Sequence, residues 1–231
     1  MNILVIDTST KYLCIGISKD SKLVVDYTTD IGRQQSRDLL PILKDLLSKA
    51  RLKISDIDVF GIGLGPGSFT GLRIGFSTIK GLNFVFKKPI VGISSLEAIA
   101  YNAINLKASL FCPVVDAKRN LVYASIYKRE NSRFRRVKHC LLIEPQRLVN
   151  LIKEDAIFMG DGLTLYKGII KDRIKTGFRF LPANYWFPRA NNLMRLVQEK
   201  IKDANSPRSF QKRVFPVYLY PQDCQVRKSN G

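Results

Sequence analysis

The residues best suited to chemistry in this chain form a glycine-rich stretch at 61–75, Gly-Ile-Gly-Leu-Gly-Pro-Gly-Ser-Phe-Thr-Gly-Leu-Arg-Ile-Gly. The apolar run at 59–64 predicts a buried strand, the glycines predict a tight turn, and Ser68 or Thr70 can cap the helix that follows. This arrangement points free backbone N–H groups at an anion. The sequence has neither the Lys-Ser/Thr of a P-loop nor a dinucleotide fingerprint with its acidic residue. A turn that needs glycine only for its backbone conformation is the alternative.

Two aspartates stand at matching places in a weak internal repeat. Residues 5–17 and 114–126 each predict a strand that ends in an aspartate, Asp7 or Asp116, followed by a short polar turn and a second strand. Because the two hairpins have the same form, the repeat suggests two similar α/β lobes.

Charge is unevenly divided between these expected lobes. We place residues 1–106 in an N-terminal lobe with 13 basic and 9 acidic side chains, and residues 107–231 in a C-terminal lobe and tail with 25 and 10. The whole chain of 231 residues has a net charge of +19. A basic second lobe favours a polyanionic partner, nucleic acid first. A solvated Lys/Arg surface is the alternative.

Metal and thiol chemistry have little support in the sequence. The four cysteines form no C-x-x-C pair, and Cys14 and Cys112 lie in apolar runs typical of a core. His139 is the only histidine, so a histidine-based metal site is excluded. The first apolar run is too short for a signal peptide, and no run reaches the ~18 residues of a membrane span. We expect a cytoplasmic protein.

Apolar spacing and turn residues predict the order of the elements. Pro41 predicts that the first helix starts close to Asp38 or is bent there. Ser94 or Ser95 can cap the third helix. Strands are expected at 2–8, 12–18, 22–28, 59–64, 90–93, 110–116, 121–128, 138–143 and 157–159, and helices at 36–50, 70–86, 95–105, 145–153, 163–171 and 190–204.

Four motifs carry a family resemblance: Ile6-Asp7-Thr8-Ser9, the string from Gly65 to Gly75, Gly92-Ile93-Ser94-Ser95-Leu96-Glu97, and Pro216-Val217-Tyr218-Leu219 near the end. Together they resemble the TsaB family, also called YeaZ. The likeness is dense over residues 1–130 and thin over 130–210. It implies an α/β fold of the two-lobed actin-like ATPase (ASKHA) class, in which each lobe is a mixed sheet with flanking helices.

The resemblance also implies a function and partners. TsaB is the non-catalytic partner of TsaD, which, with TsaE, makes threonylcarbamoyladenosine next to the anticodon of tRNA. We therefore expect a heterodimer with TsaD, TsaE in the complex, tRNA bound through the complex, and a possible homodimer of the isolated chain. No cofactor is expected on this chain alone, whereas ATP or ADP and a metal ion are expected in TsaD.

The residues themselves argue against catalysis by this chain. In the actin-like fold two hairpin turns hold the nucleotide phosphates, and Asp7, Thr8 and Ser9 are weak candidates for the first. The second turn, Asp-Ala-Lys-Arg at 116–119, has no glycine or hydroxyl after its aspartate. Gly160-Asp161-Gly162 is a poor match to the glycine pair that such folds keep for adenosine. We expect no enzyme activity from the chain on its own.

Metal ligands are also missing at the places that the resemblance indicates. TsaD relatives carry two histidines in the helix after the strand at 90–93, and the matching positions here are Ser95 and Ile99. Isoleucine cannot bind a metal ion. The resemblance therefore implies that the metal belongs to TsaD.

Glycines inside the predicted helix at 70–86 suggest a close contact. Gly71 and Gly75 share one face, and each glycine inside a helix costs about 1 kcal/mol relative to alanine. The resemblance implies that the first two helices pack against TsaD, whereas close packing on the chain's own sheet is the alternative. Many relatives have a histidine where Gln35 stands. The expected interface residues are Gln35, Leu39, Leu43, Ser68, Thr70, Gly71, Arg73 and Gly75.

Cations of the second lobe are the candidates for tRNA contact: Lys118, Arg119, Arg133, Arg135 and Arg136. No RNA-stacking motif is visible, so binding would be mostly to phosphates. Two other functions stay open. A small-molecule kinase or ATPase of the actin-like class would need a complete second phosphate turn. A peptidase would need a catalytic set that one histidine does not provide.

Overall fold

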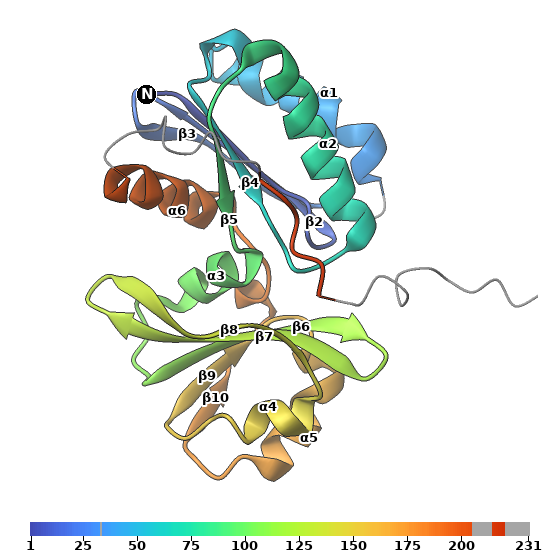
Figure 1. Ribbon diagram of the computed structural model, residues 1–231, viewed down its shortest axis with the longest axis vertical. Helices are drawn as coiled ribbons and strands as arrows, with labels where there is room; N and C mark the ends of the chain where they lie inside the picture. The colour runs from blue at the N-terminus through green and yellow to red at the C-terminus, as the bar shows by residue number, and fades with distance from the viewer. Residues whose placement is uncertain (33, 205–213, 220–231) are drawn as a thin grey trace, which may run out of the picture.

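Two five-stranded sheets form the framework of the protein in Figure 1, a computed structural model that describes residues 1–32, 34–204 and 214–219. Both sheets are mixed, because the central strand of each pairs antiparallel with one neighbour and parallel with the other. The first sheet has the order β3 (Lys22–Asp30), β2 (Tyr12–Lys19), β1 (Ile3–Asp7), β4 (Val59–Gly63), β5 (Ile90–Ile93). The second has the order β10 (Phe178–Phe180), β9 (Ala156–Met159), β6 (Leu110–Lys118), β7 (Leu121–Glu130), β8 (Arg133–Ile143).

Helices cover both faces of the first sheet. Helices α1 (Gln35–Lys49) and α2 (Phe69–Phe86) lie on one face, and α6 (Ala190–Asp203) lies on the other (Figure 1). Leu4 and Ile6 of β1 pack into the α1–α2 side of the core, whereas Ile3 and Val5 pack into the α6 side. A strand buried on both faces has an uninterrupted apolar sequence.

The second sheet is covered in the same way. Helices α4 (Pro145–Val149) and α5 (Leu163–Arg173) lie on one face. Helix α3 (Ser95–Ala100), followed by a 3-10 turn at Tyr101–Ala103, lies between the two sheets (Figure 1). One continuous cluster of buried side chains joins the sheets here, with Val91 from the first sheet and Phe111 and Tyr127 from the second.

Helix α6 returns from the second half of the chain to the first half. It packs against β1, β2, β3, β4 and β5 of the first sheet. The apolar side of α6, with Leu193 and Val197, provides part of the shared core. We had placed residues 107–231 in the C-terminal lobe and did not predict that α6 packs on the first sheet. The division of the chain at residue 106 stays a prediction.

Most predicted elements match the structure to within a few residues. Ser68 caps α2, because its Oγ accepts a hydrogen bond from the Gly71 N–H at 3.1 Å. Helix α1 begins at Gln35 and not near Asp38, so Pro41 lies inside it. Strand β8 begins at Arg133 and not at 138, and the three residues of β10 were too few to give a pattern. Two further 3-10 turns span Ile54–Asp56 and Ala183–Tyr185. Among the helices in the described ranges, none is long and apolar enough to cross a membrane.

Candidate functional site

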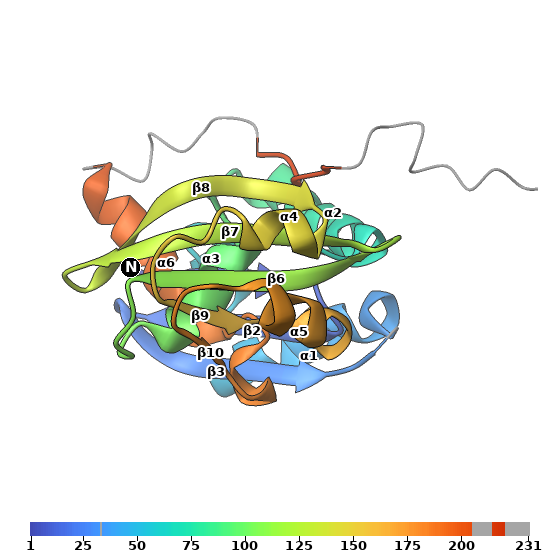
Figure 2. The same cartoon turned by 90° about the horizontal axis from the view of Figure 1, so that it is seen from below.

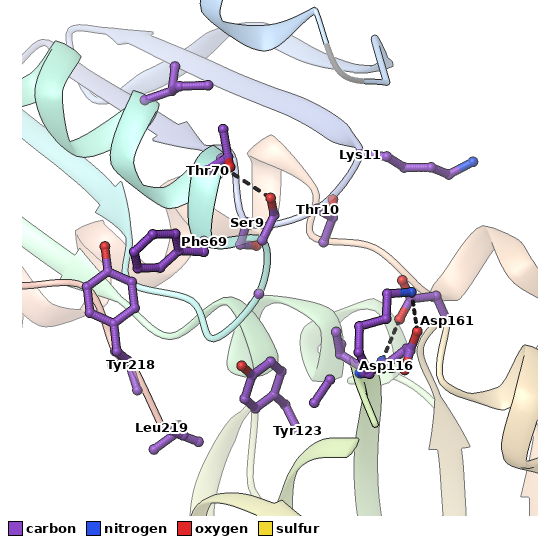
Figure 3. Close-up of a pocket in the computed structure, with 18 of the residues that line it drawn as sticks. Ser9, Thr10, Lys11, Phe69, Thr70, Asp116, Tyr123, Asp161, Tyr218 and Leu219 are labelled. Carbon is purple, nitrogen blue, oxygen red and sulfur yellow. Dashed lines mark hydrogen bonds and ion pairs between the residues drawn. The ribbon is translucent and has the colours of Figure 1, made fainter. Parts of the chain in front are cut away.

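A cavity of about 880 Å³ lies between the two sheets, and Figure 3 shows its wall. The β1–β2 turn and the start of α2 line one side, and the β6–β7 turn lines the other. Residues 217–219 near the end of the chain also reach it. A cavity of this size suits a small-molecule ligand. Its lining includes Ser9, Thr10, Lys11, Phe69, Thr70, Asp116, Lys118, Arg119, Tyr123, Asp161, Tyr218 and Leu219.

Asp7, one of the predicted nucleotide residues, is fully buried and does not belong to the cavity wall. Ser95 Oγ donates a hydrogen bond of 2.6 Å to its Oδ2, and the Ser9 N–H donates one of 2.7 Å to its Oδ1. Burial raises the pKa of this carboxyl above its ordinary range, although the bonds from Ser9 and Ser95 act in the opposite direction. The side chain of Asp7 thus joins the end of β1 to the start of α3.

Thr8 and Ser9 form hydrogen bonds with the glycine-rich loop and the start of α2. Thr8 Oγ1 donates to the carbonyl of Gly71 at 2.7 Å, and the carbonyl of Ser9 accepts from the Ser68 N–H at 2.7 Å. A Cβ at Gly67 would overlap this Ser9 carbonyl. The glycine string therefore lets two turns pack closely, and Gly65 has the positive φ, 83°, that the alternative of a turn requiring glycine predicted. Only the main chain of Gly could approach so near.

The second turn carries its cations beside two carboxylates. Lys118 Nζ forms an ion pair with Asp116 Oδ2, and the Asp116 N–H donates to Asp161 Oδ1 at 3.1 Å. Figure 3 shows the two aspartates side by side in the cavity wall. Burial raises the pKa of Asp161, and the ion pair with Asp116 raises the pKa of Lys118. Lys118 and Arg119 both adopt positive φ angles, 64° and 54°, at the hairpin tip.

These residues do not fit the phosphates of a nucleotide held as in an active actin-like protein. In the first turn, Thr8 and the carbonyl of Ser9 are bonded to the glycine-rich loop, and Asp7 is buried and bonded to Ser95. Asp116 from the second turn and Asp161 from the loop after β9 both bring a carboxylate to the cavity wall, where it would repel a phosphate. Lys118 is already paired with one of them.

The expected metal positions have structural roles. Ser95 donates to Asp7, and Ile99 is completely buried in the core between the sheets. His139 is exposed on β8. In the described part of the chain, no group of three or more His, Cys, Asp or Glu could hold a metal ion.

Four of the eight expected interface residues face the chain's own core, and their role in partner contact stays a prediction. Leu39 and Leu43 of α1 are only 1% and 3% exposed and pack on the first sheet. Gly71 is buried, and its carbonyl accepts from Thr8. A Cβ at Gly75 would overlap Thr8 Oγ1, so this glycine serves close packing of α2 on β1. The alternative of packing within the monomer was right for these glycines.

The remaining expected interface residues lie at the surface or begin a helix. Ser68, Thr70 and Arg73 are exposed in the first turns of α2, and the Arg73 guanidinium lies 3.8 Å from the centre of the Phe69 ring. Gln35 is the first residue of α1. A role of these four residues in partner contact stays a prediction.

Sequence reasoning missed the exposed face of α2. Phe84 and Val85 are 76% and 68% exposed, and none of the residues that the structure describes lies within 4 Å of a Cβ built on Gly81. With Ser77 and Lys80, these residues recur at the spacing of one helix face. That spacing was visible in the sequence, but the apolar side that faces the core was not distinguishable from the side that faces solvent.

The predicted tRNA-contact arginines are paired with acids. Arg133 binds Asp203 at 2.8 Å, Arg135 pairs with Glu130, and Arg136 binds Glu97 at 3.0 Å. The pairs of Arg133 and Arg136 connect β8 of the second sheet to α6 and α3. Much of their charge is therefore neutralised within the molecule. Lys118 pairs with Asp116, and Arg119 lines the cavity. The contact of all five with tRNA stays a prediction.

Comparison with known proteins agrees with the fold and the motifs. The family model described as TsaD, tRNA N6-adenosine threonylcarbamoyltransferase, matches residues 29–223. The tRNA threonylcarbamoyladenosine biosynthesis protein TsaB of Bacillus subtilis is 30% identical over 204 residues, which are 87% of this chain and 88% of that protein. TsaB of Haemophilus influenzae is 26% identical over 230 residues, 95% and 93% of the two chains.

A solved structure matches over nearly the whole chain. YeaZ from Pseudomonas aeruginosa has a TM-score of 0.79 and 26% identity, and the match covers 94% of this chain and 99% of that one. The two mixed sheets and this match confirm the predicted actin-like fold class. The similarity to TsaB proteins confirms the predicted relation to tRNA threonylcarbamoyladenosine biosynthesis. The chain belongs to the TsaB family, also called YeaZ.

Proposed function

We propose that this chain is the non-catalytic subunit that binds TsaD and supports its transfer of the threonylcarbamoyl group to tRNA. The buried and bonded Asp7 and the ion-paired second turn support a non-catalytic role, because neither turn leaves groups free to hold nucleotide phosphates. ATP or ADP and the metal ion then belong to TsaD. TsaE joins the pair, and tRNA binds through the complex.

The exposed face of α2 is the observation that carries this proposal. Phe84 and Val85 offer large apolar surface to solvent, and Gly81 between them and Ser77 leaves space for another backbone. Leu40 on the neighbouring helix α1 is also exposed. Small residues at a helix contact allow axes to approach at the lower end of the usual ~8–10 Å range. We place the TsaD contact on this face, and not on the buried Gly71 and Gly75.

The test is association with the TsaD of the same source. Gly81→Leu adds a side chain to open space, so the isolated variant should stay folded but lose its complex with TsaD. Gly168→Leu is the matched control, because Gly168 is also an exposed helical glycine with nothing within 4 Å of its Cβ position. Co-purification measures the complex of both variants, and nucleoside analysis of tRNA from cells that carry the Gly81→Leu variant measures threonylcarbamoyladenosine.

Two results would contradict the proposal in different ways. If the Gly81→Leu variant binds TsaD with native affinity, the exposed face of α2 is not the TsaD interface. A chain that never co-purifies with TsaD, and whose deletion leaves threonylcarbamoyladenosine in tRNA unchanged, would remove the function itself.

We propose that the two lobes contribute different surfaces to the complex. Residues 1–106 supply α1 and α2, the side toward TsaD, and residues 107–231 supply the basic second sheet together with α6. Because α6 packs on the first sheet, the two parts are expected to act as one unit.

A further inference from the structure

One basic stretch of the second half, from α5 to β10, differs from the others in how few of its cations are paired with acids. Near β7, β8 and α6, the acids Glu130, Glu199 and Asp203 pair with arginines. By contrast, the segment from α5 to β10 has one acid, Asp172, among five cations. Those cations are Lys167, Lys171, Arg173, Lys175 and Arg179, and all are exposed.

Four of these cations have no acidic partner in the described part of the chain: Lys167, Lys171, Arg173 and Lys175. We name these four residues the α5 basic surface. Lys167 and Lys171 are one helical turn apart and therefore share a face of α5. Arg173 ends the helix and Lys175 follows it. Arg179 is left out because its guanidinium donates a hydrogen bond to the carbonyl of Lys107.

The position of this surface leaves it free when TsaD is bound. In Figure 1, α5 lies at the opposite end of the molecule from α1 and α2. Figure 2 views the molecule from that end, where α4 and α5 lie at the front. A partner on the α2 face and a second partner on α5 could therefore be bound at the same time.

The side chains of α5 indicate which kind of partner fits. Its apolar residues Leu163, Tyr166 and Ile170 are buried on the second sheet, and Leu165 alone is a large exposed apolar side chain on this helix. A helix that inserts into a lipid surface needs a free apolar face, which α5 does not have. Unpaired lysines and arginine on a rigid element instead suit a phosphate backbone.

We propose that the α5 basic surface contacts the phosphate backbone of RNA, in place of the arginines of β8. This inference rests on the proposed function, which makes tRNA the polyanion of the complex. Contact through phosphates orients the RNA without reading its sequence. The arginines of β8 hold α6 and α3 instead, through Asp203, Glu199 and Glu97.

The experiment is a salt titration of binding to an unmodified tRNA transcript. It uses the full chain alone and in complex with TsaD. Lys167→Glu with Lys171→Glu should weaken binding and flatten the log–log salt dependence by roughly 0.7–0.9 for each phosphate that the protein no longer neutralises. Lys167→Arg with Lys171→Arg should keep the native slope. Lys22→Glu with Lys53→Glu is the matched control, because both are exposed lysines of the first lobe whose side chains form no ion pair with the acids of the described residues.

The outcomes separate this inference from the proposed function. Unchanged affinity and slope in the Lys167→Glu, Lys171→Glu chain would overturn the inference, as would an equally large effect in the control. Binding of the native chain to anionic lipid vesicles but not to tRNA would also overturn it. If the TsaD complex forms and threonylcarbamoyladenosine is made in either case, the proposed function stands. If no complex forms, the titration of the isolated chain still decides the inference.

Discussion

Ser95 Oγ donates a hydrogen bond of 2.6 Å to Asp7 Oδ2 and accepts one of 3.1 Å from the Gly65 N–H. Through this one hydroxyl, the end of β1, the glycine-rich loop and the start of α3 are held together. The carboxylate of Asp7 is fully buried in this packing and does not line the cavity. This explains why a cavity of suitable size does not by itself indicate an ATPase.

We predict that Asp7 makes stability fall as the pH rises above about 4, the ordinary pKa of an unfolded aspartate. Burial raises the folded-state pKa, so the folded chain binds this proton more tightly than the unfolded chain does. The resulting stabilisation is present below the unfolded pKa and is lost as the pH rises through the folded one. Asp7→Asn does not titrate and should become more stable relative to the native chain across this window.

Urea unfolding of both chains at several pH values between about 4 and 7 measures the effect. Asp45→Asn, an exposed aspartate of α1, is the control. A stability difference between Asp7→Asn and the native chain that stays constant with pH would refute the prediction.

Two glycines of α2 should respond in opposite directions to the same substitution. Gly75→Ala should destabilise the isolated chain by about 1–3 kcal/mol, because the new Cβ overlaps Thr8 Oγ1, which is held by Gly71. Gly81→Ala should stabilise it by up to about 1 kcal/mol, since alanine is the better helix former and the site is open. Denaturant midpoints of the two variants decide the matter. Equal effects would mean that Gly75 is not packed as described.

The ion pair between Arg136 and Glu97 should contribute more to stability than the pair between Arg135 and Glu130. Arg136 lies 5.8 Å from the Tyr127 ring centre and joins β8 to α3, and the side chain of its partner Glu97 is only 17% exposed. Its removal in Arg136→Ala should cost about 1.5–3 kcal/mol, the range for hydrogen bonds to charged groups. Arg135→Ala breaks an exposed pair and should cost less than about 1 kcal/mol. Thermal and urea unfolding compare the two, and a larger destabilisation at Arg135 would contradict the assignment.

The isolated chain should not turn over ATP. Asp7 and Thr8 are bonded to Ser95 and Gly71, and Lys118 is paired with Asp116, so these groups are already occupied. Phosphate release from pure protein is the measurement, and Lys118→Ala is the companion variant. Steady turnover that disappears in the Lys118→Ala chain would show a working site in the cavity.

Much of the fold could be predicted from local sequence. Apolar runs and turn residues located the strands from β1 to β9, and Ser68 was one of two predicted caps of α2. Two hairpins of the same form, each with an aspartate at the end of its first strand, predicted two similar lobes, and each hairpin lies in one of the two sheets. These features depend on neighbours along the chain, which is why the sequence reveals them. Strand β10 was not predicted, because three residues are too few to show an alternation of apolar and polar side chains.

The site needed the tertiary structure. Gly75 and Gly81 look alike in the sequence, yet one lies against Thr8 and the other in open space. Arg133 and Arg136 looked like a surface cluster until β8 placed them beside Asp203 and Glu97, acids that are distant in the chain.

The sequence by itself thus determined the class of fold, the glycine-rich loop and the family. Only the tertiary structure decided which side of α2 is free, which cations are neutralised and where α6 packs. The physical reason is that periodicity reports burial along one element. Close packing and charge pairing are set by residues from different elements that meet only when the sheets are assembled.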